Sequence, residues 1–367
     1  MIAPTVSVVM SVFNGRQFLR EAMESILDQS FREFEFIVID DGSTDGSGAV
    51  LDSYQRSDPR VRILHQENRG LIESLNRGCR LARCEYIARM DADDIAIRDR
   101  LRWQVDFMEK HPEVGVLGGA VEFINAVGKS THVCFTPTED SEIKSSLLRD
   151  CVIVHPTVLM RKDAFELAGG YRRVVVEAED YDLWLRIADC FQLANLGTVV
   201  LKYRHHPFQI SVRNRRQQAL SSLAAQTAVM ARRNGEPDPL DSVEEITPAV
   251  LVRLGVSEAV QQANLCRICL GRIGSMYDAG EYSSALNLTT EILRSPDWRH
   301  AEKWVIADLY LFAARLYWRE GKLWRSIFAT GYAIITRPIT LGRPFKALLR
   351  WLRPLFAQPR TGTHPIR

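Results

Sequence analysis

Three carboxylates fall within four positions at the end of the apolar stretch YIARMDADDI (86–95): Asp91, Asp93 and Asp94. Ionised carboxylates repel one another and are costly to desolvate, so such a cluster persists where a cation or hydrogen-bond donors compensate it. Residues two apart on a strand face the same side, so Asp91 and Asp93 could share one ion. Mg²⁺ and Mn²⁺ prefer oxygen ligands and also bind substrate phosphates. The alternative is a solvated acidic turn with Asp94 as a helix cap.

A second acidic stretch, IDDGSTDGS (39–47), carries Asp40 and Asp41 at the end of another apolar run. A carboxylate at a strand end can accept hydrogen bonds from a ribose hydroxyl or a base N–H, and Gly42 permits close approach of the backbone. Ser43 or Thr44 could cap the following helix. A capped strand-to-helix turn is therefore the simpler interpretation, and it is compatible with binding.

Two further stretches contain residues suited to proton transfer or metal binding. Glu179 and Asp180 precede an apolar helical pattern. Adjacent carboxylates in a partly apolar pocket have raised pKa values and can act as a general base, although negative charge also simply stabilises a helix N-terminus. The pair His205 and His206 could lie in the core, stack on another ring or supply a metal ligand.

The elements that would position these residues alternate between strand and helix through the first half of the chain. Buried-strand patterns at 5–13 and 34–40 are separated by helical apolar spacing, and two more strand–helix repeats follow. This order predicts an α/β fold, with a mostly parallel sheet covered by helices on both faces. Ligands bind outside the carboxyl ends of such strands. Asn14, Asp40, Asp41, Asp91 and Asp93 should therefore converge on one edge.

The second half of the chain is helical by pattern, and we expect three regions. Residues 1–213 form the α/β domain, residues 214–248 a polar, Pro-containing linker or helical connection, and residues 249–367 an all-α C-terminal region. Two stretches in this region have loosely matching spacings of Gly, Tyr and Pro that resemble tetratricopeptide hairpins, the alternative being an unrelated helical bundle. The first comprises Gly274, Tyr277, Gly280, Tyr282, Ala285 and Pro296, and the second Tyr317, Gly321, Leu323, Ser326 and Pro338.

Composition narrows the classes of protein. The 367 residues are 46% hydrophobic and 25% charged, with a formal net charge of +2, so nucleic acid is not an expected partner. No apolar run reaches the roughly 18 residues needed to span a bilayer, and the start lacks the basic lead of a signal peptide. Seven cysteines without a secretion signal fit a reducing cytosol. Cys266 and Cys269 have helical spacing and are expected to be buried thiols.

Taken together, six segments resemble family 2 glycosyltransferases over about residues 4–212: SVVMSVFN, IDDGSTDGS, NRGLIESLNRG, YIARMDADDI, HPTV and AEDYDLWLRIA. The resemblance implies the GT-A fold and an inverting, hexosyltransferase-like enzyme that uses Mn²⁺ or Mg²⁺. It implies transfer from a UDP-, GDP- or TDP-sugar to a hydroxyl of a saccharide or lipid-linked acceptor. Such enzymes act in the synthesis of cell-envelope polysaccharide, lipopolysaccharide or exopolysaccharide.

The resemblance also implies roles for individual residues. Asp41 contacts the nucleotide base, Asp91 and Asp93 form the D-x-D pair with Asp93 the firmer metal ligand, and His206 completes the metal site. Asp180 is the catalytic base, with Glu179 as its neighbour. The expected nucleotide-sugar contacts are Ser11, Phe13, Asn14, Glu21, Asp40, Asp41, Asn68, Gly70, Asn76, Arg89 and Asp91.

This sequence departs from the family pattern at two positions. Leu75 stands where many members have an arginine that contacts the diphosphate, so Arg89 or Arg77 is expected to substitute, and Ser11 replaces a common proline.

The absence of Q-x-x-R-W argues against a processive polymerase of the cellulose-synthase type. One alternative is a sugar-nucleotide pyrophosphorylase, although SVFNGRQF lacks the Gly-rich loop of those enzymes. The other is a non-catalytic sugar-nucleotide-binding scaffold, which retention of the acidic residues disfavours.

The end of the chain is strongly basic. Residues 321–367 contain nine Lys and Arg and no Asp or Glu. The segment FKALLRWLRPLF interleaves basic and apolar residues, a pattern typical of an interfacial helix. We therefore expect peripheral contact of residues 339–356 with an anionic membrane, at the cytoplasmic face of the inner membrane. The alternative is a helix that packs on its own domain or on a partner.

Overall fold

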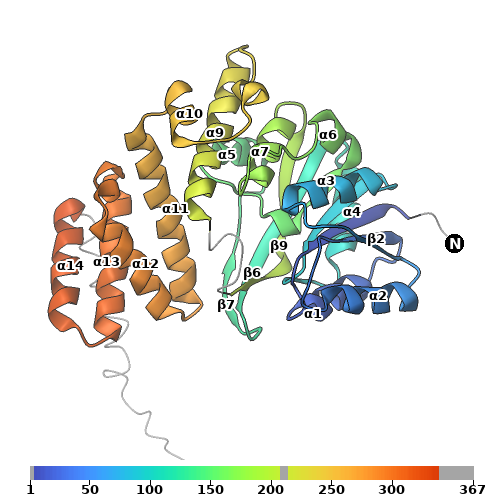
Figure 1. The fold of residues 1–367 in the computed structure, drawn as a ribbon, viewed down its shortest axis with the longest axis horizontal. Helices are drawn as coiled ribbons and strands as arrows, with labels where there is room; N and C mark the ends of the chain where they lie inside the picture. The colour runs from blue at the N-terminus through green and yellow to red at the C-terminus, as the bar shows by residue number, and fades with distance from the viewer. Residues whose placement is uncertain (1–3, 207–213, 339–367) are drawn as a thin grey trace, which may run out of the picture. The chain divides into compact units, whose positions relative to one another are not determined.

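The computed structural model describes residues 4–206 and 214–338. The chain forms two compact units, Met1–Gln261 and Gln262–Arg367 (Figure 1). The first unit is built on a sheet with the strand order β3-β2-β1-β4-β8-β6-β9-β5, and β7 pairs with β6. The strands are β1 (Val6–Val12), β2 (Phe34–Asp40), β3 (Val61–His65), β4 (Tyr86–Asp91), β5 (Ile95–Ala96), β6 (Val114–Asn125), β7 (Ser130–Cys134), β8 (Leu159–Arg161) and β9 (Gln192–His205).

The first four strands are parallel, as their alternation with helices predicts. Their register places Ser11 of β1 beside Asp91 of β4, and Val12 beside Asp40 of β2. The acid-bearing ends of β2 and β4 therefore lie at one edge on either side of the end of β1. Beyond β4 the sheet is mixed, because β8 runs antiparallel to both β4 and β6 while β9 runs parallel to β6.

Helices cover both faces of this sheet, because each strand buries alternate side chains on opposite sides. Ile37 of β2 packs in a core with Leu75 and Trp184, whereas its neighbour Phe36 packs in a second core with Leu19. The helices of this unit are α1 (Leu19–Leu27), α2 (Ser47–Ser57), α3 (Leu71–Leu81), α4 (Arg100–Lys110), α5 (Asp140–Leu147), α6 (Lys162–Leu167), α7 (Glu179–Ile187), α9 (Arg215–Arg233) and α10 (Pro248–Arg253), with 3₁₀ turns η1 (His155–Thr157) and η2 (Pro239–Ser242).

The first unit extends beyond the boundary expected at residue 213. Helix α9 buries Ala224 and Ala228 in the same core as Trp184, and Leu240 and Ile246 of the following polar segment join that core. The composition of residues 234–248 suggested a linker, but two apolar side chains are enough to pack this segment against the α/β unit. The compact unit accordingly ends at Gln261.

The second unit consists of helical pairs. Helix α11 (Glu258–Asp278) leads into α12 (Tyr282–Arg294), and α13 (Lys303–Arg319) leads into α14 (Leu323–Thr336), with η3 (Pro296–His300) between the pairs. Gly280 (φ 82°) and Gly321 (φ 71°) occupy equivalent turns, since their N–H groups donate to the carbonyls of Tyr277 and Trp318. The two hairpins thus share one turn geometry, and their identity as tetratricopeptide repeats stays a prediction.

Two other expectations concern the membrane and the cysteines. None of the helices in the described part of the chain is both long enough and apolar enough to cross a bilayer. The predicted membrane contact of residues 339–356 lies outside the described residues. Cys266 and Cys269 are fully buried on α11, as their helical spacing predicts.

Gly78 tests how closely α3 packs on the sheet. A Cβ atom at this position would lie 2.5 Å from Cγ1 of Val9 in β1. We expect Gly78→Ala to lower the free energy of unfolding by about 1–3 kcal/mol through overpacking, despite the better helix propensity of alanine. Gly271→Ala on α11 is the control, because its Cβ would meet no atom within 4 Å. Equal melting temperatures of the two variants, measured by circular dichroism, would contradict this packing.

Candidate active site

The loops that follow β1 and β2 are bonded to each other. Asn14, which has φ 52°, accepts the N–H of Thr44 at 2.8 Å and donates its own N–H to Oγ of Ser43 at 3.0 Å. The carboxylate of Asp45, rather than Ser43 or Thr44, accepts the N–H of Ser47 at 2.9 Å, where α2 begins. The side chains expected to cap the helix are therefore used to join the two loops.

Asp41 organises the loop between β3 and α3. Its buried carboxylate accepts the side-chain amide of Gln66 at 2.6 Å and the N–H groups of Arg69 and Gly70, each at 2.9 Å. The neighbouring Gly42 is required here, because a Cβ atom would lie 2.8 Å from the backbone nitrogen of Asn68. A carboxylate offers about four acceptor positions, so one remains for a ligand.

Asp40 is the last residue of β2, and its carboxylate has different partners from that of Asp41. Its Oδ2 lies 2.8 Å from Nδ1 of His65, and Nε2 of His65 lies 2.9 Å from Asp52. Hydrogen bonds to Asp52 and Asp40 raise the pKa of His65. Asp40 also accepts the N–H of Ser43 at 3.2 Å, so it supports the loop after β2 from behind.

The acidic cluster at the end of β4 consists of Asp91, Asp93 and Asp94, which can bring one oxygen each within 4.8 Å of one another. Asp94 is 1% exposed. Its Oδ1 accepts the N–H of Arg204 at 2.8 Å, but its buried Oδ2 has no hydrogen-bond partner within residues 4–206 and 214–338. Burial, followed by the charges of Asp93 and Asp91, raises the pKa of Asp94 well above its usual range.

These residues fit a divalent cation. Three carboxylates converge, one of them has an unsatisfied buried oxygen, and Nε2 of His206 lies 2.9 Å from Oδ2 of Asp93. Such a set of oxygens with one imidazole suits Mn²⁺ or Mg²⁺. Asp94 was not among the metal ligands expected from the sequence, because period-two alternation selects Asp91 and Asp93. The strand ends at Asp91, however, and the turn that follows brings Asp94 to the same point.

Arg204 holds this cluster in place and was not identified from the sequence. It is 1% exposed, donates from Nε to the carbonyl of Asp93 at 2.8 Å, and bonds Glu21 at 2.5 Å. Its guanidinium lies 4.6 Å from the ring centroid of Phe18, and the ring of His206 lies 4.9 Å from the same centroid. Glu21, expected among the nucleotide contacts, thus reaches the acidic cluster through Arg204.

Arg89 places a positive charge beneath the acidic cluster. Its side chain is 4% exposed and forms an ion pair with Asp91, while its buried Nε has no hydrogen-bond partner in the described parts of the chain. The charge of Arg89 lowers the pKa values of Asp91, Glu179 and Asp180, against the larger effect of burial. One buried cation therefore acts on both groups of carboxylates.

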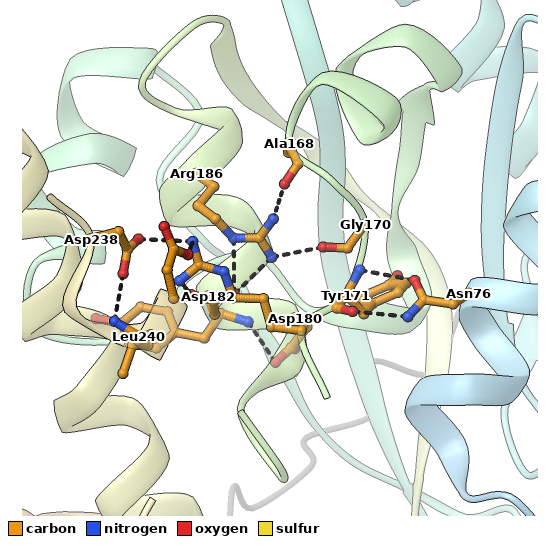
Figure 2. A network of polar contacts seen from close by, with 12 residues as sticks. Asn76, Ala168, Gly170, Tyr171, Asp180, Asp182, Arg186, Asp238 and Leu240 are labelled. Atoms are coloured by element: carbon orange, nitrogen blue, oxygen red, sulfur yellow. Dashed lines mark hydrogen bonds and ion pairs between the residues drawn. The ribbon is translucent and has the colours of Figure 1, made fainter. Parts of the chain in front are cut away.

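Asn76 and Tyr171 connect α3 to the loop before α7. The side chain of Asn76 donates to the carbonyl of Tyr171 at 2.8 Å and accepts its N–H at 3.0 Å (Figure 2). The hydroxyl of Tyr171 lies 2.8 Å from Nε2 of His155, and Nδ1 of His155 lies 4.0 Å from Asp180. His155 belongs to the HPTV segment that resembles the family, but its contacts with Tyr171 and Asp180 are known only from the fold.

Glu179 and Asp180 form the first turn of α7. Burial and the charge of Asp180 raise the pKa of Glu179 to about 8. Burial raises the pKa of Asp180 to about 6, against the N–H of Tyr181, which bonds its Oδ1 at 2.7 Å. The charge of Asp91 also raises the pKa of Asp180. The carboxyls of α7 and those at the end of β4 therefore share one electrostatic environment.

An ion-pair network anchors α7 and the loop that carries Tyr171. Arg186 bonds Asp182 at 2.7 Å and the carbonyl of Gly170 at 2.8 Å, and it also contacts the carbonyl of Ala168 (Figure 2). Asp238 accepts Arg172 at 2.8 Å. Burial alone would raise the pKa of Asp238, but hydrogen bonds from Arg172, the N–H of Leu240 and Arg232 hold it at about 2. These contacts fix α7 relative to the segment after α9.

Comparisons with known proteins identify the family. The model described as Glycosyl transferase family 2 matches residues 7–167. The glycosyltransferase EpsE of Bacillus subtilis is 35% identical over 206 residues, which are 55% of this chain and 73% of EpsE. The chain belongs to glycosyltransferase family 2. The amylovoran biosynthesis glycosyltransferase AmsE of Erwinia amylovora is a second relative of this glycosyltransferase, 34% identical over 54% of this chain and 75% of its own length.

Solved structures agree on the fold of the glycosyltransferase. The mannosyltransferase PcManGT from Pyrobaculum calidifontis, in complex with GDP-Man and Mn²⁺, superposes with a TM-score of 0.51 at 18% identity, over 87% of this chain and 89% of its own. TarS 1–349 of S. aureus with UDP-GlcNAc gives a TM-score of 0.51 at 15% identity, over 89% and 90%. The GT-A fold followed by a helical C-terminal region, expected from the sequence, is confirmed.

The structure brings most of the predicted site residues of the glycosyltransferase to the carboxyl edge of the parallel strands. Ser11 lies beside Asp91 in the sheet, Phe13 is 52% exposed just beyond β1, and Gly70 donates to Asp41. The backbone of Asn68 lies against Gly42. Direct contact of these residues with a nucleotide sugar stays a prediction.

Asp94 provides a test of the metal site. We expect Asp94→Asn to weaken Mn²⁺ binding about 10–100-fold, because it removes the charge of the carboxylate whose Oδ2 is unsatisfied. Isothermal titration of the full chain with MnCl₂ measures this change. Asp99→Asn is the matched control, since Asp99 bonds Ser30 and Arg102 at the surface. Unchanged affinity in Asp94→Asn would exclude Asp94 from the metal site.

Proposed function

We propose that this family member is a metal-dependent, inverting glycosyltransferase. It would transfer a hexose from a nucleotide-diphosphate sugar to a hydroxyl of a saccharide or lipid-linked acceptor during polysaccharide assembly. The observation that carries the proposal is the unsatisfied oxygen of Asp94 within a three-carboxylate cluster that shares its electrostatic environment with Asp180. The name of AmsE, a glycosyltransferase of amylovoran biosynthesis, supports the polysaccharide context.

The donor would bind along the edge formed by the ends of β1, β2 and β4. The carboxylate of Asp41 accepts three hydrogen bonds, and its fourth acceptor position would receive the nucleotide base. Arg89 carries a buried charge next to the expected diphosphate site. The complexes of TarS with UDP-GlcNAc and of PcManGT with GDP-Man support a donor of this class. Arg89 would thereby compensate for Leu75 at the position where many family members have arginine.

Asp91, Asp93, Asp94 and His206 would hold Mn²⁺ or Mg²⁺. Once bound, the ion would neutralise the charge that develops on the departing nucleoside diphosphate. The protein fixes the ligands beforehand, since Arg204 bonds the backbone of Asp93 and donates its N–H to Asp94.

Asp180 would take the proton of the acceptor hydroxyl. With a pKa of about 6 it is largely ionised at neutral pH, whereas Glu179, with a pKa of about 8, is largely protonated. One carboxylate is thereby available as the base, and its neighbour carries no competing charge. A base placed on the face opposite the leaving group makes single displacement, and hence inversion, the natural course. General-base catalysis of this kind typically contributes about 10²–10⁴ in rate.

A donor panel with wild type and two variants tests the proposal. We expect Asp180→Asn to lower transfer about 10²–10⁴-fold while metal-dependent nucleotide binding persists. Asp93→Asn should lose both, because it removes a metal ligand. Asp106→Asn, at an exposed position of α4, is the control. Formation of nucleoside triphosphate and sugar 1-phosphate from the donor and pyrophosphate would instead identify a pyrophosphorylase, and binding without any turnover would identify a scaffold.

The pH profile separates the two carboxyls of α7. Because Asp180 must be ionised to act as base, kcat/KM should rise as pH increases through about 6. Glu179→Gln mimics the protonated neighbour and should leave this rising limb in place. Rates measured with saturating MnCl₂ across the pH range check both expectations. A limb that moves to pH 8, or activity lost in Glu179→Gln but kept in Asp180→Asn, would reverse the assigned roles.

A further inference from the structure

Helix α14, the last helix drawn in Figure 1, packs with its small residues inward. Ser326, Ala329 and Ala333 are buried, and Oγ of Ser326 donates to the carbonyl of Ala314 on α13 at 2.8 Å. The large apolar residues point outward instead: Trp324 is 74% exposed and Phe328 76%. A helix that only completes a core has the opposite arrangement.

The exposed residues form a continuous line along the helix, which we call the α14 stripe: Trp324, Ile327, Phe328 and Ile335. Ile327 and Phe328 follow Trp324 by three and four residues, and Ile335 follows Phe328 by seven. This spacing places the four side chains on one face of the helix. Gly331 lies between Phe328 and Ile335, and a Cβ there would meet no atom within 4 Å. The last element of a helical array normally has a polar outer face, so this stripe is suited to being covered.

The surroundings of the stripe are basic. Lys322, which forms an ion pair with Glu320, and Arg325 lie at the start of α14, and Arg337 follows its end. Helix α14 itself contains no acidic residue, and residues 321–367 contain nine Lys and Arg without one Asp or Glu. Since the whole chain has a net charge of only +2, this concentration of one sign is local to its end.

We propose that the α14 stripe is a contact surface for an anionic lipid bilayer. Tryptophan, phenylalanine and isoleucine side chains would enter the boundary between headgroups and acyl chains, and the basic residues beside them would pair with lipid phosphates. Because residues 339–367 are also basic, docking them on the stripe would bring like charges together, and so would docking a second copy of α14. An anionic surface compensates the charge of residues 339–367 and also that of the basic residues beside the α14 stripe. This inference is independent of the proposed reaction.

Flotation of the full-length chain with vesicles tests the proposal. We expect recovery with vesicles of equal parts phosphatidylcholine and phosphatidylglycerol, and little recovery with phosphatidylcholine alone. Trp324→Ala combined with Phe328→Ala should lower the partition coefficient about tenfold or more, because two large side chains no longer leave water. Phe135→Ala, which removes a 68% exposed aromatic residue just after β7, is the matched control and should bind like wild type.

A second double variant, Phe328→Gln with Ile335→Gln, should also lose binding. The circular dichroism spectra of both double variants must match that of wild type, so that a loss of binding is not caused by misfolding. Trp324→Phe should retain binding but reduce the blue shift of tryptophan fluorescence on vesicles, which places this residue at the lipid. Binding that persists in both double variants, or that does not need phosphatidylglycerol, would overturn the proposal.

Two further outcomes would refute lipid as the occupant of the stripe. A chain that ends at Pro338 should bind anionic vesicles more weakly than the full chain, yet still depend on Trp324 and Phe328. Complete loss of vesicle binding after this truncation would show that residues 339–367, and not the stripe, contact the lipid. A dimer in size-exclusion chromatography that Trp324→Ala/Phe328→Ala dissociates would identify a second copy as the occupant.

Discussion

The ion pair between the buried Arg89 and the partly exposed Asp91 is the interaction on which the site depends. A guanidinium that is almost inaccessible to water must be compensated, and it is surrounded by carboxyl groups whose pKa values it lowers. Burial acts in the opposite direction on Asp94, Glu179 and Asp180, so the single cation does not neutralise the group as a whole. The carboxyl groups at the end of β4 and at the start of α7 therefore outnumber the guanidinium of Arg89, and a further cation would favour their ionised forms. This is the condition under which a divalent ion and a diphosphate can bind together.

The second constraint is that the loops around this charge are tied to one another. Asp41 holds residues 66–70, Asn14 holds the loop after β2, and Asn76 holds the backbone of Tyr171. Several side chains expected to contact a donor thus spend part of their hydrogen-bonding capacity on their neighbours. Such a site is formed before the donor arrives, which lowers the entropy lost on binding. Its selectivity for a nucleotide would then depend on backbone groups and on the few acceptor positions that remain.

Comparison of sequence and structure shows which of these features a single sequence can predict. The strands that end in Asp40 and Asp91 were predictable because buried strands have the pattern of apolar runs, and parallel strands end at one edge. Arg204 and His155 were not, since their roles arise from contacts with residues far away in the chain, such as Asp93 and Tyr171. The unit boundary differed for a related reason. Polarity suggested a linker after residue 213, but the packing of Leu240 and Ile246 decides where the first unit ends.

The separation of charge along the chain would suit the second unit to a role in membrane attachment. A cluster of carboxylates is repelled by an anionic bilayer, so the first unit is poorly suited to attach itself to one. Attachment through α14 and the basic residues that follow it would separate the two tasks, since each unit could keep the charge that its ligand requires. Apolar stripe and basic flanks also act together, because a few exposed aromatic residues or a few cations alone give only weak, reversible binding. The exposed large residues of α14 are then a feature of function rather than a defect of packing.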